Sequence, residues 1–173
     1  MDTITAKRHI FSMLDVDGDG VISRQEYLAR PERAAAALGR ADDDPLVSLA
    51  RTAHERVFAS MDANLDGRVT FTEYEAWAGG EAFDEVCRPA LGSLFDLADA
   101  DDDGHLDRAE FTRLRQALGN PAASARSAFD ALDEDGDGRI DRDAYLAQIR
   151  SFVTDGVSPM ARALHAEAGS LTT

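Results

Sequence analysis

A fourfold repeat of an acidic, glycine-containing segment constrains the fold of this 173-residue chain more than any other feature. The segments begin at Asp15, Asp62, Asp99 and Asp133, and each follows an apolar stretch with helical spacing. Three segments match D-x-[DN]-x-[DN]-G-x₅-E throughout, and the fourth departs from this pattern only at its last residue, Ala144. Such a repeat predicts four helix-loop-helix units. The segments read DVDGDGVISRQE (15–26), DANLDGRVTFTE (62–73), DADDDGHLDRAE (99–110) and DEDGDGRIDRDA (133–144).

The spacing of oxygen-bearing residues in each segment suits a hard cation. Ca²⁺ takes about six to eight oxygen ligands, and a twelve-residue loop supplies them from positions 1, 3, 5, 7 and 9 and from a bidentate glutamate at position 12. Glycine at position 6 permits the sharp turn. The first three loops therefore predict three calcium sites. With position 7 contributing its backbone carbonyl, the expected ligands are Asp15, Asp17, Asp19, Val21, Ser23 and Glu26, then Asp62, Asn64, Asp66, Arg68, Thr70 and Glu73, then Asp99, Asp101, Asp103, His105, Asp107 and Glu110.

The fourth loop lacks the bidentate glutamate, because Ala144 occupies position 12. Two of the oxygens that Ca²⁺ requires are therefore missing. Asp143 precedes this position and is expected to point away from the ion. We predict a weak or empty site, or one that accepts Mg²⁺ with added waters. Its expected ligands are Asp133, Asp135, Asp137, the carbonyl of Arg139 and Asp141.

Each of the first three loops also ends in a helix start signal. Ser23, Thr70 and Asp107 are favourable N-cap residues, and a glutamate follows each of them three positions later. This is the spacing of a capping box, in which the glutamate side chain accepts a hydrogen bond from the N-cap backbone. The same glutamate can instead face a cation, and the aspartate-rich segment before it favours that role.

The eighth position of every loop predicts how the loops pair. It is always aliphatic, which suits a short antiparallel bridge between loops 1 and 2 and between loops 3 and 4. We therefore expect an all-α fold in which four repeats form two paired lobes of one compact globule, with short β-bridges between paired loops. The residues concerned are Ile22, Val69, Leu106 and Ile140.

Helix-breaking residues divide the chain into two predicted pairs of repeats and a tail. Gly79-Gly80 lies between the second and third repeats, so we predict an N-terminal pair over 1–78 and a C-terminal pair over 81–155. A tail over 156–173 is expected to start a short helix at Ser158-Pro159 and to dock into a groove of its own protein.

Other breakers fall within or between the expected helices. Pro31 and Pro89 are expected to bend the helices that contain them, because proline lacks an N–H and clashes with the preceding turn. Asn120 is expected to cap the helix that follows Pro121. Leu49 belongs to an apolar stripe that is expected to pack in the core.

The charge balance limits the partners. Asp and Glu number 33 against 18 Lys and Arg, and the resulting net charge of −15 repels nucleic acid and anionic membranes. Calcium ions and basic partners are favoured instead. Cys87 is the only cysteine, no basic start precedes an apolar run, and no long apolar stretch is present. We therefore expect a soluble cytoplasmic monomer with a buried apolar thiol.

Catalytic residues are not apparent. No activated serine or cysteine stands out, and the four histidines lack the spacing of a zinc site. We expect a protein without enzymatic activity or an organic cofactor, in which three of these histidines are surface or helix-packing residues and His105 contributes only its backbone. The histidines are His9, His54, His105 and His165.

The four loops and their flanking helices, over residues 4–155, resemble the EF-hand superfamily. The long interval between the first two loops, the size and the imperfect fourth loop resemble the sarcoplasmic calcium-binding proteins and the bacterial proteins of the calerythrin type more than calmodulin. That resemblance implies a compact calcium buffer or modulator. A silent second site is common in that group, whereas here the second loop is intact and the fourth is defective.

The second hypothesis is a calcium sensor, which regulates a target protein by exposing an apolar groove to a basic amphipathic helix. Sensor grooves are typically rich in methionine. Beyond the first residue this chain offers only Met13, Met61 and Met160, and the first two are expected to pack in the core. A large calcium-dependent increase in exposed apolar surface would distinguish a sensor from a buffer.

Overall fold

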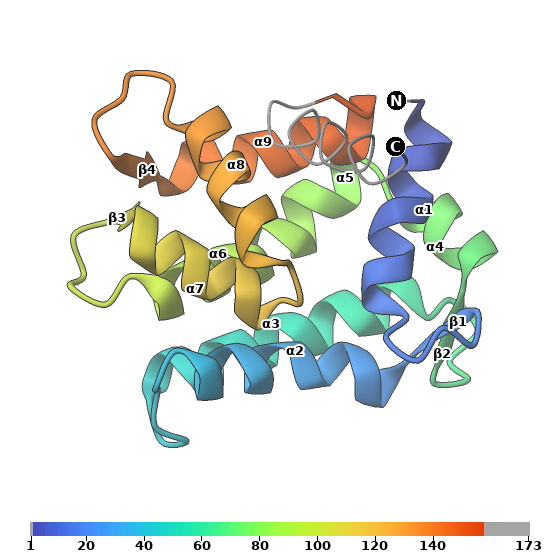
Figure 1. Ribbon diagram of the computed structural model, residues 1–173. Helices are drawn as coiled ribbons and strands as arrows, with labels where there is room; N and C mark the ends of the chain where they lie inside the picture. The colour runs from blue at the N-terminus through green and yellow to red at the C-terminus, as the bar shows by residue number, and fades with distance from the viewer. Residues whose placement is uncertain (1, 158–173) are drawn as a thin grey trace.

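The computed structural model describes residues 2–157, and helices dominate this part of the chain (Figure 1). The predicted all-α architecture with four helix-loop-helix repeats is confirmed. The helices are α1 Thr3–Leu14, α2 Arg24–Ala37, α3 Pro45–Met61, α4 Phe71–Trp77, α5 Gly80–Ala82, the π-helix η1 Phe83–Cys87, α6 Arg88–Ala98, α7 Arg108–Ala117, α8 Ala122–Leu132 and α9 Arg142–Asp155. The strands are β1 Val21–Ser23, β2 Arg68–Thr70, β3 His105–Asp107 and β4 Arg139–Asp141.

Two short antiparallel bridges join the loops in pairs. β1 pairs with β2, where Ile22 lies opposite Val69, and β3 pairs with β4, where Leu106 lies opposite Ile140. All four side chains are buried. The predicted pairing of loop 1 with loop 2 and of loop 3 with loop 4 is therefore confirmed.

Two apolar clusters hold the helices together. One contains residues of the four helices α1, α2, α3 and α4, among them Phe11, Phe58 and Tyr74. The other joins helices α6 to α9 and also includes Ala34 from α2 and Val47 from α3. Helices α2 and α3 therefore pack against both halves of the chain, and they lie side by side in Figure 1.

The structure corrects two expected core positions, Leu49 and Met13. Leu49 is 62% exposed, because it lies on the face of α3 opposite the buried residues Val47, Ala50 and His54. Met61 is buried as expected, but Met13 retains 36% of its accessible surface. The lobe boundaries predicted from the glycines remain a prediction.

The two prolines that were expected to bend helices both lie in helical segments, and the bends themselves stay a prediction. Pro31 lies inside α2 and is buried, and the π-helical turn η1 ends just before Pro89. A wider turn of this kind is one way to place a proline in a continuing helix. The expected N-cap at Asn120 is wrong, because α8 is preceded by Pro121 and Asn120 bonds Arg115 instead.

The expected tail helix at Ser158-Pro159 and its docking lie outside the described residues. Between residues 2 and 157, no helix combines the length and the apolar character needed to cross a bilayer.

Candidate metal centres

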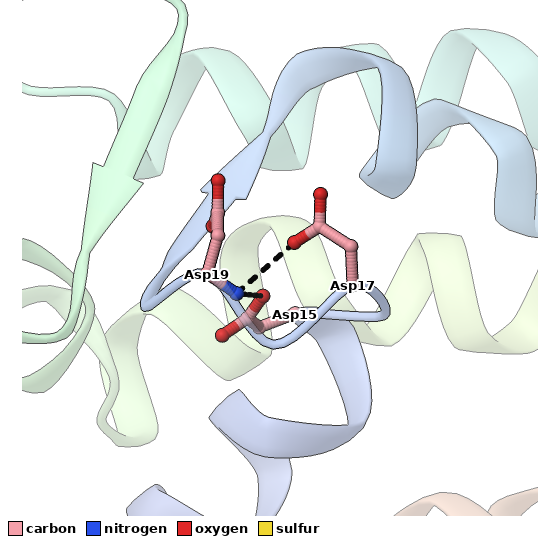
Figure 2. Close-up of side chains that lie close together, drawn as sticks. All are labelled: Asp15, Asp17 and Asp19. Atoms are coloured by element: carbon pink, nitrogen blue, oxygen red, sulfur yellow. Dashed lines mark hydrogen bonds between the residues drawn. The ribbon is translucent and has the colours of Figure 1, made fainter.

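The first loop gathers three aspartates between α1 and β1. The carboxylates of Asp15, Asp17 and Asp19 each offer an oxygen, and these oxygens lie within 4.8 Å of one another (Figure 2). The loop backbone holds them there, because Asp15 accepts hydrogen bonds from the N–H groups of Asp19 at 3.1 Å and Gly20 at 2.9 Å. Asp17 also accepts from the N–H of Asp19 at 3.1 Å.

The second and third loops hold their first aspartate by the same backbone hydrogen bonds. Asp62 accepts from the N–H of Gly67 at 2.9 Å, and Asp99 accepts from the N–H of Gly104 at 2.9 Å. Asp62 and Asp99 are both only 6% exposed. A carboxylate buried to this degree needs hydrogen bonds or a cation to offset its desolvation. These two side chains are therefore held at the inner edge of their loops.

The glutamates at position 12 form the predicted capping boxes. In each of loops 1 to 3 the N-cap side chain accepts from the N–H of the glutamate, and the glutamate accepts from the N-cap N–H. Two of these glutamates also reach the start of their loop: Glu26 accepts from the N–H of Asp17 at 3.1 Å, and Glu110 accepts from the N–H of Ala100 at 2.9 Å. Glu110 also joins Asp99 and Asp101 in one carboxylate cluster. The capping role and a metal-facing position are therefore compatible.

The charges gathered in these loops repel one another. A hydrogen bond from the backbone of Asp19 lowers the pKa of Asp17, but desolvation and the neighbouring carboxylates outweigh it and leave the pKa raised. Desolvation raises the pKa of Asp101, and the negative charge of Asp103 adds to the increase. A raised carboxyl pKa means that the ionised form is destabilised. A divalent cation at these oxygens would remove that cost.

Glu26 shows the opposite balance. Desolvation raises its pKa, but hydrogen bonds from Ser23 and Asp17 outweigh this effect and leave the pKa lowered. The carboxylate at position 12 of the first loop is therefore held in its ionised form, the form that coordinates a metal.

The fourth loop keeps its aspartates together but lacks the acidic clamp. Oxygens of Asp133, Asp135 and Asp137 lie within 4.8 Å of one another. Asp141 accepts from the N–H groups of Asp143 at 3.0 Å and Ala144 at 3.1 Å, so it caps α9. Asp143 points away from the loop, as expected, and pairs with Arg88 at 2.9 Å.

One oxygen of the fourth loop has no partner. Asp133 Oδ2 accepts from the N–H of Gly138 at 3.0 Å, whereas Asp133 Oδ1 is buried without a hydrogen bond among the residues described. A buried carboxylate oxygen without a partner is costly, and a cation would satisfy it. The donor sets of all four loops therefore fit a hard divalent cation, but the fourth set is the poorest.

Carboxylates gather in loops 1, 3 and 4, the remaining ligand assignments stay predictions, and the backbone shows a feature that residue identities did not reveal. Position 4 of every loop has a positive φ, including 58° at Leu65 and 57° at Asp102. Residues other than glycine rarely adopt this conformation. Loops 1 and 4 place Gly18 and Gly136 at the same position. These two glycines were the feature of the sequence from which a positive φ at position 4 could have been predicted.

A long-range contact that supports the third loop was also not predicted. Arg40, in the connection after α2, donates to the carbonyl oxygens of Leu97 at 2.9 Å and Asp99 at 3.2 Å. These groups end the helix that leads into loop 3. Arg40 therefore fixes the C-terminus of α6 beside the first expected ligand, and it does so across 57 residues of chain.

Comparisons with known proteins agree with this geometry. The family model described as an EF-hand domain pair matches residues 6–79 and again 88–150. A calcineurin subunit from Naegleria gruberi is 34% identical over 111 residues, a segment that covers 64% of this chain and 54% of that protein. The matched segment therefore spans about half the length of this relative.

Two solved structures share the fold. A Streptomyces coelicolor calcium-binding protein, studied for prokaryotic calcium-mediated regulation, has a TM-score of 0.76 and 26% identity, with 89% of this chain and 99% of that chain covered. The structure of n-aequorin has a TM-score of 0.76 and 22% identity, with coverage of 96% and 92%.

Proposed function

Because the chain belongs to the EF-hand family of calcium-binding proteins, we propose that its first three loops are calcium sites and that it acts as an intracellular calcium buffer or modulator. The observation that carries this proposal is the clustering of carboxylates within the loops, which in loop 3 brings Glu110 at position 12 together with Asp99 and Asp101. In this proposal the side chains at positions 1, 3, 5, 9 and 12 and the carbonyl at position 7 hold the ion. The bound ion relieves carboxylate repulsion and so couples binding to folding.

The fourth loop is proposed to bind calcium weakly. Asp141 is already engaged as the cap of α9, and Ala144 offers no oxygen. The unpartnered Asp133 Oδ1 supports residual affinity for a cation, and waters would complete the shell. Mg²⁺ accepts such a partly hydrated site more readily than Ca²⁺ does.

Substitution of the position 12 glutamates tests the assignment of the sites. Glu26→Gln, Glu73→Gln and Glu110→Gln should each reduce the calcium stoichiometry by one, because each removes the bidentate ligand of one loop. Calorimetric titration with calcium measures the stoichiometry. Ala144→Glu should add one site, and Glu134→Gln, an exposed position between two expected ligands, should change nothing. Full stoichiometry in all three glutamate variants would refute the ligand assignment.

Apolar-dye fluorescence during the same titration separates the buffer from the sensor. A buffer stays closed, so we expect three calcium ions to bind, with and without Mg²⁺, while the dye signal changes by less than about twofold. A large calcium-dependent increase in dye fluorescence would contradict the buffer and favour the sensor. Four ions of equal affinity would show that waters compensate for Ala144.

A regulator of a target protein is the second candidate, and one observation favours it. Met13, Met61 and several aromatic side chains line a cavity between the helices of both halves, and opening the helix pairs would expose this surface. The names of the relatives agree, because one is a subunit of calcineurin and another was studied for calcium-mediated regulation. A basic amphipathic helix would suit the acidic chain.

We further propose a cytoplasmic monomer without enzymatic activity.

A further inference from the structure

A cavity lies between helices of the N-terminal half of the chain and helices of the C-terminal half. Its volume is about 130 Å³, and helices α1 to α4 contribute one part of its wall while η1, α6, α7 and α9 contribute the other. A protein cavity of about 150 Å³ holds a benzene ring. The space in this protein therefore suits an organic group of similar size, and none of the expected calcium ligands lines it.

Most of the wall is apolar or carries no charge at neutral pH. Trp77 and Phe152 contribute aromatic surface. His54 also lines the cavity, and desolvation lowers its pKa to about 4. Desolvation raises the pKa of the Cys87 thiol to about 12 and raises the pKa of the Tyr27 hydroxyl further. These three polar groups are therefore neutral under ordinary conditions.

Two arginines provide the positive charge in this wall. Arg30 is half-buried and lies over the ring of Tyr27 at 6.0 Å, and its guanidinium forms no ion pair with any residue between 2 and 157. Arg115 is only 7% exposed, and its Nη2 donates to Asn120 at 3.1 Å while its Nε is buried without a partner. Desolvation lowers the pKa of Arg30, and the charge of Arg115 adds to this effect, so the two charges are near enough to repel.

The lack of a matching anion is unusual in so acidic a chain. The sequence has 33 Asp and Glu, yet none of those within residues 2–157 lines the cavity. Seven other arginines in the same part of the structure form ion pairs with carboxylates. A buried cation needs an anionic partner to offset its desolvation. Arg30 and Arg115 therefore place positive charge beside an apolar space, and no carboxylate of the described residues balances it there.

We propose that this cavity binds a small amphipathic carboxylate, whose head pairs with Arg30 and Arg115 and whose alkyl or aryl body lies against Trp77 and Phe152. Guanidinium groups suit a carboxylate because they offer parallel donors in one plane. The apolar wall contacts the alkyl or aryl part of the ligand. The volume of the cavity limits this part to about one ring or a medium-length chain.

Octanoate is the probe that we would titrate into the full chain at saturating calcium. Calorimetry should show one octanoate per chain, whereas octylamine, which has the same chain length and the opposite charge, should not bind. Arg30→Met should weaken octanoate binding about ten- to hundredfold, because it removes a charged hydrogen-bond partner. Arg113→Met, an exposed arginine on α7 that does not line the cavity, should leave the affinity unchanged. Absence of octanoate binding, equal binding of octylamine, or an unchanged Arg30→Met affinity would overturn the proposal.

A second measurement locates the ligand without relying on a variant. Cys87 lines the cavity, and it is the only cysteine in the chain. Saturating octanoate should slow labelling of this thiol by a disulfide reagent at least about fivefold, because the bound ligand covers the side of Cys87 that lines the cavity. Octylamine should have no effect on the rate. An unchanged labelling rate at saturating octanoate would place the ligand elsewhere and refute the proposed site.

Discussion

Saturating calcium should raise the melting temperature of this protein by about 20 °C. A ligand at about 100 times its dissociation constant adds about 2.7 kcal/mol per independent site, so three sites add about 8 kcal/mol. For a chain of this size, each kcal/mol corresponds to about 2–4 °C. Three divalent ions also add six positive charges to the net charge of −15, which leaves −9 and weakens the repulsion within the native state. Differential scanning calorimetry in calcium and in chelator measures the shift.

The position 12 variants provide the control for this stabilisation. A variant that lacks one site, such as Glu73→Gln, should lose about a third of the calcium-induced free energy, because the three sites are treated as independent. Its melting temperature in chelator should stay close to that of the parent chain. A melting temperature that calcium does not change would contradict the proposed coupling between metal binding and folding.

The second large effect concerns His54 and acidic pH. The ring is 1% exposed on α3, its Nδ1 lies 2.7 Å from the carbonyl oxygen of Ala50, and Tyr27 packs against it at 5.7 Å. Desolvation lowers its pKa to about 4, and the charge of Arg30 adds to the effect. The unfolded chain therefore binds a proton on this histidine at a higher pH than the native state does.

Acidification should consequently destabilise the native protein through this group. With a native pKa of about 4 and an ordinary value of 6.5, the loss develops as the pH falls from 6.5 towards 4. It amounts to about 3 kcal/mol in the free energy of unfolding. Urea unfolding in chelator at several pH values measures it, and His54→Leu should remove this part of the pH dependence. Comparing the parent chain with His54→Leu separates the contribution of His54 from that of the titrating carboxylates.

An exposed position on the same helix offers a control for this experiment. Leu49→Gln on α3 should leave the pH dependence of stability parallel to that of the parent chain, because it adds and removes no titratable group. If the parent chain and His54→Leu instead lost the same stability between pH 6.5 and pH 4, the buried neutral histidine would not be the cause.

The sequence alone determined the parts of this protein that lie within a short stretch of chain. The ligand set of the first loop spans twelve residues, so its spacing determines which oxygens can meet, and Gly20 permits the turn that brings them together. The pairing of Ile22 with Val69 also followed from their places in the repeat. The predicted weakness of the fourth loop depends on one residue, Ala144, which is visible without any structure.

Tertiary structure decided what depends on residues far apart in the chain. Periodicity shows that α3 has a buried face, but the misassigned Leu49 shows that it does not fix the edge of that face. Arg40 meets the end of α6 across 57 residues, and no local pattern predicts such a contact. Arg30 and Arg115 read as ordinary helical arginines in sequence. Only the packing of the two halves places both in the wall of one cavity, because their environment comes from helices that the sequence does not position relative to one another.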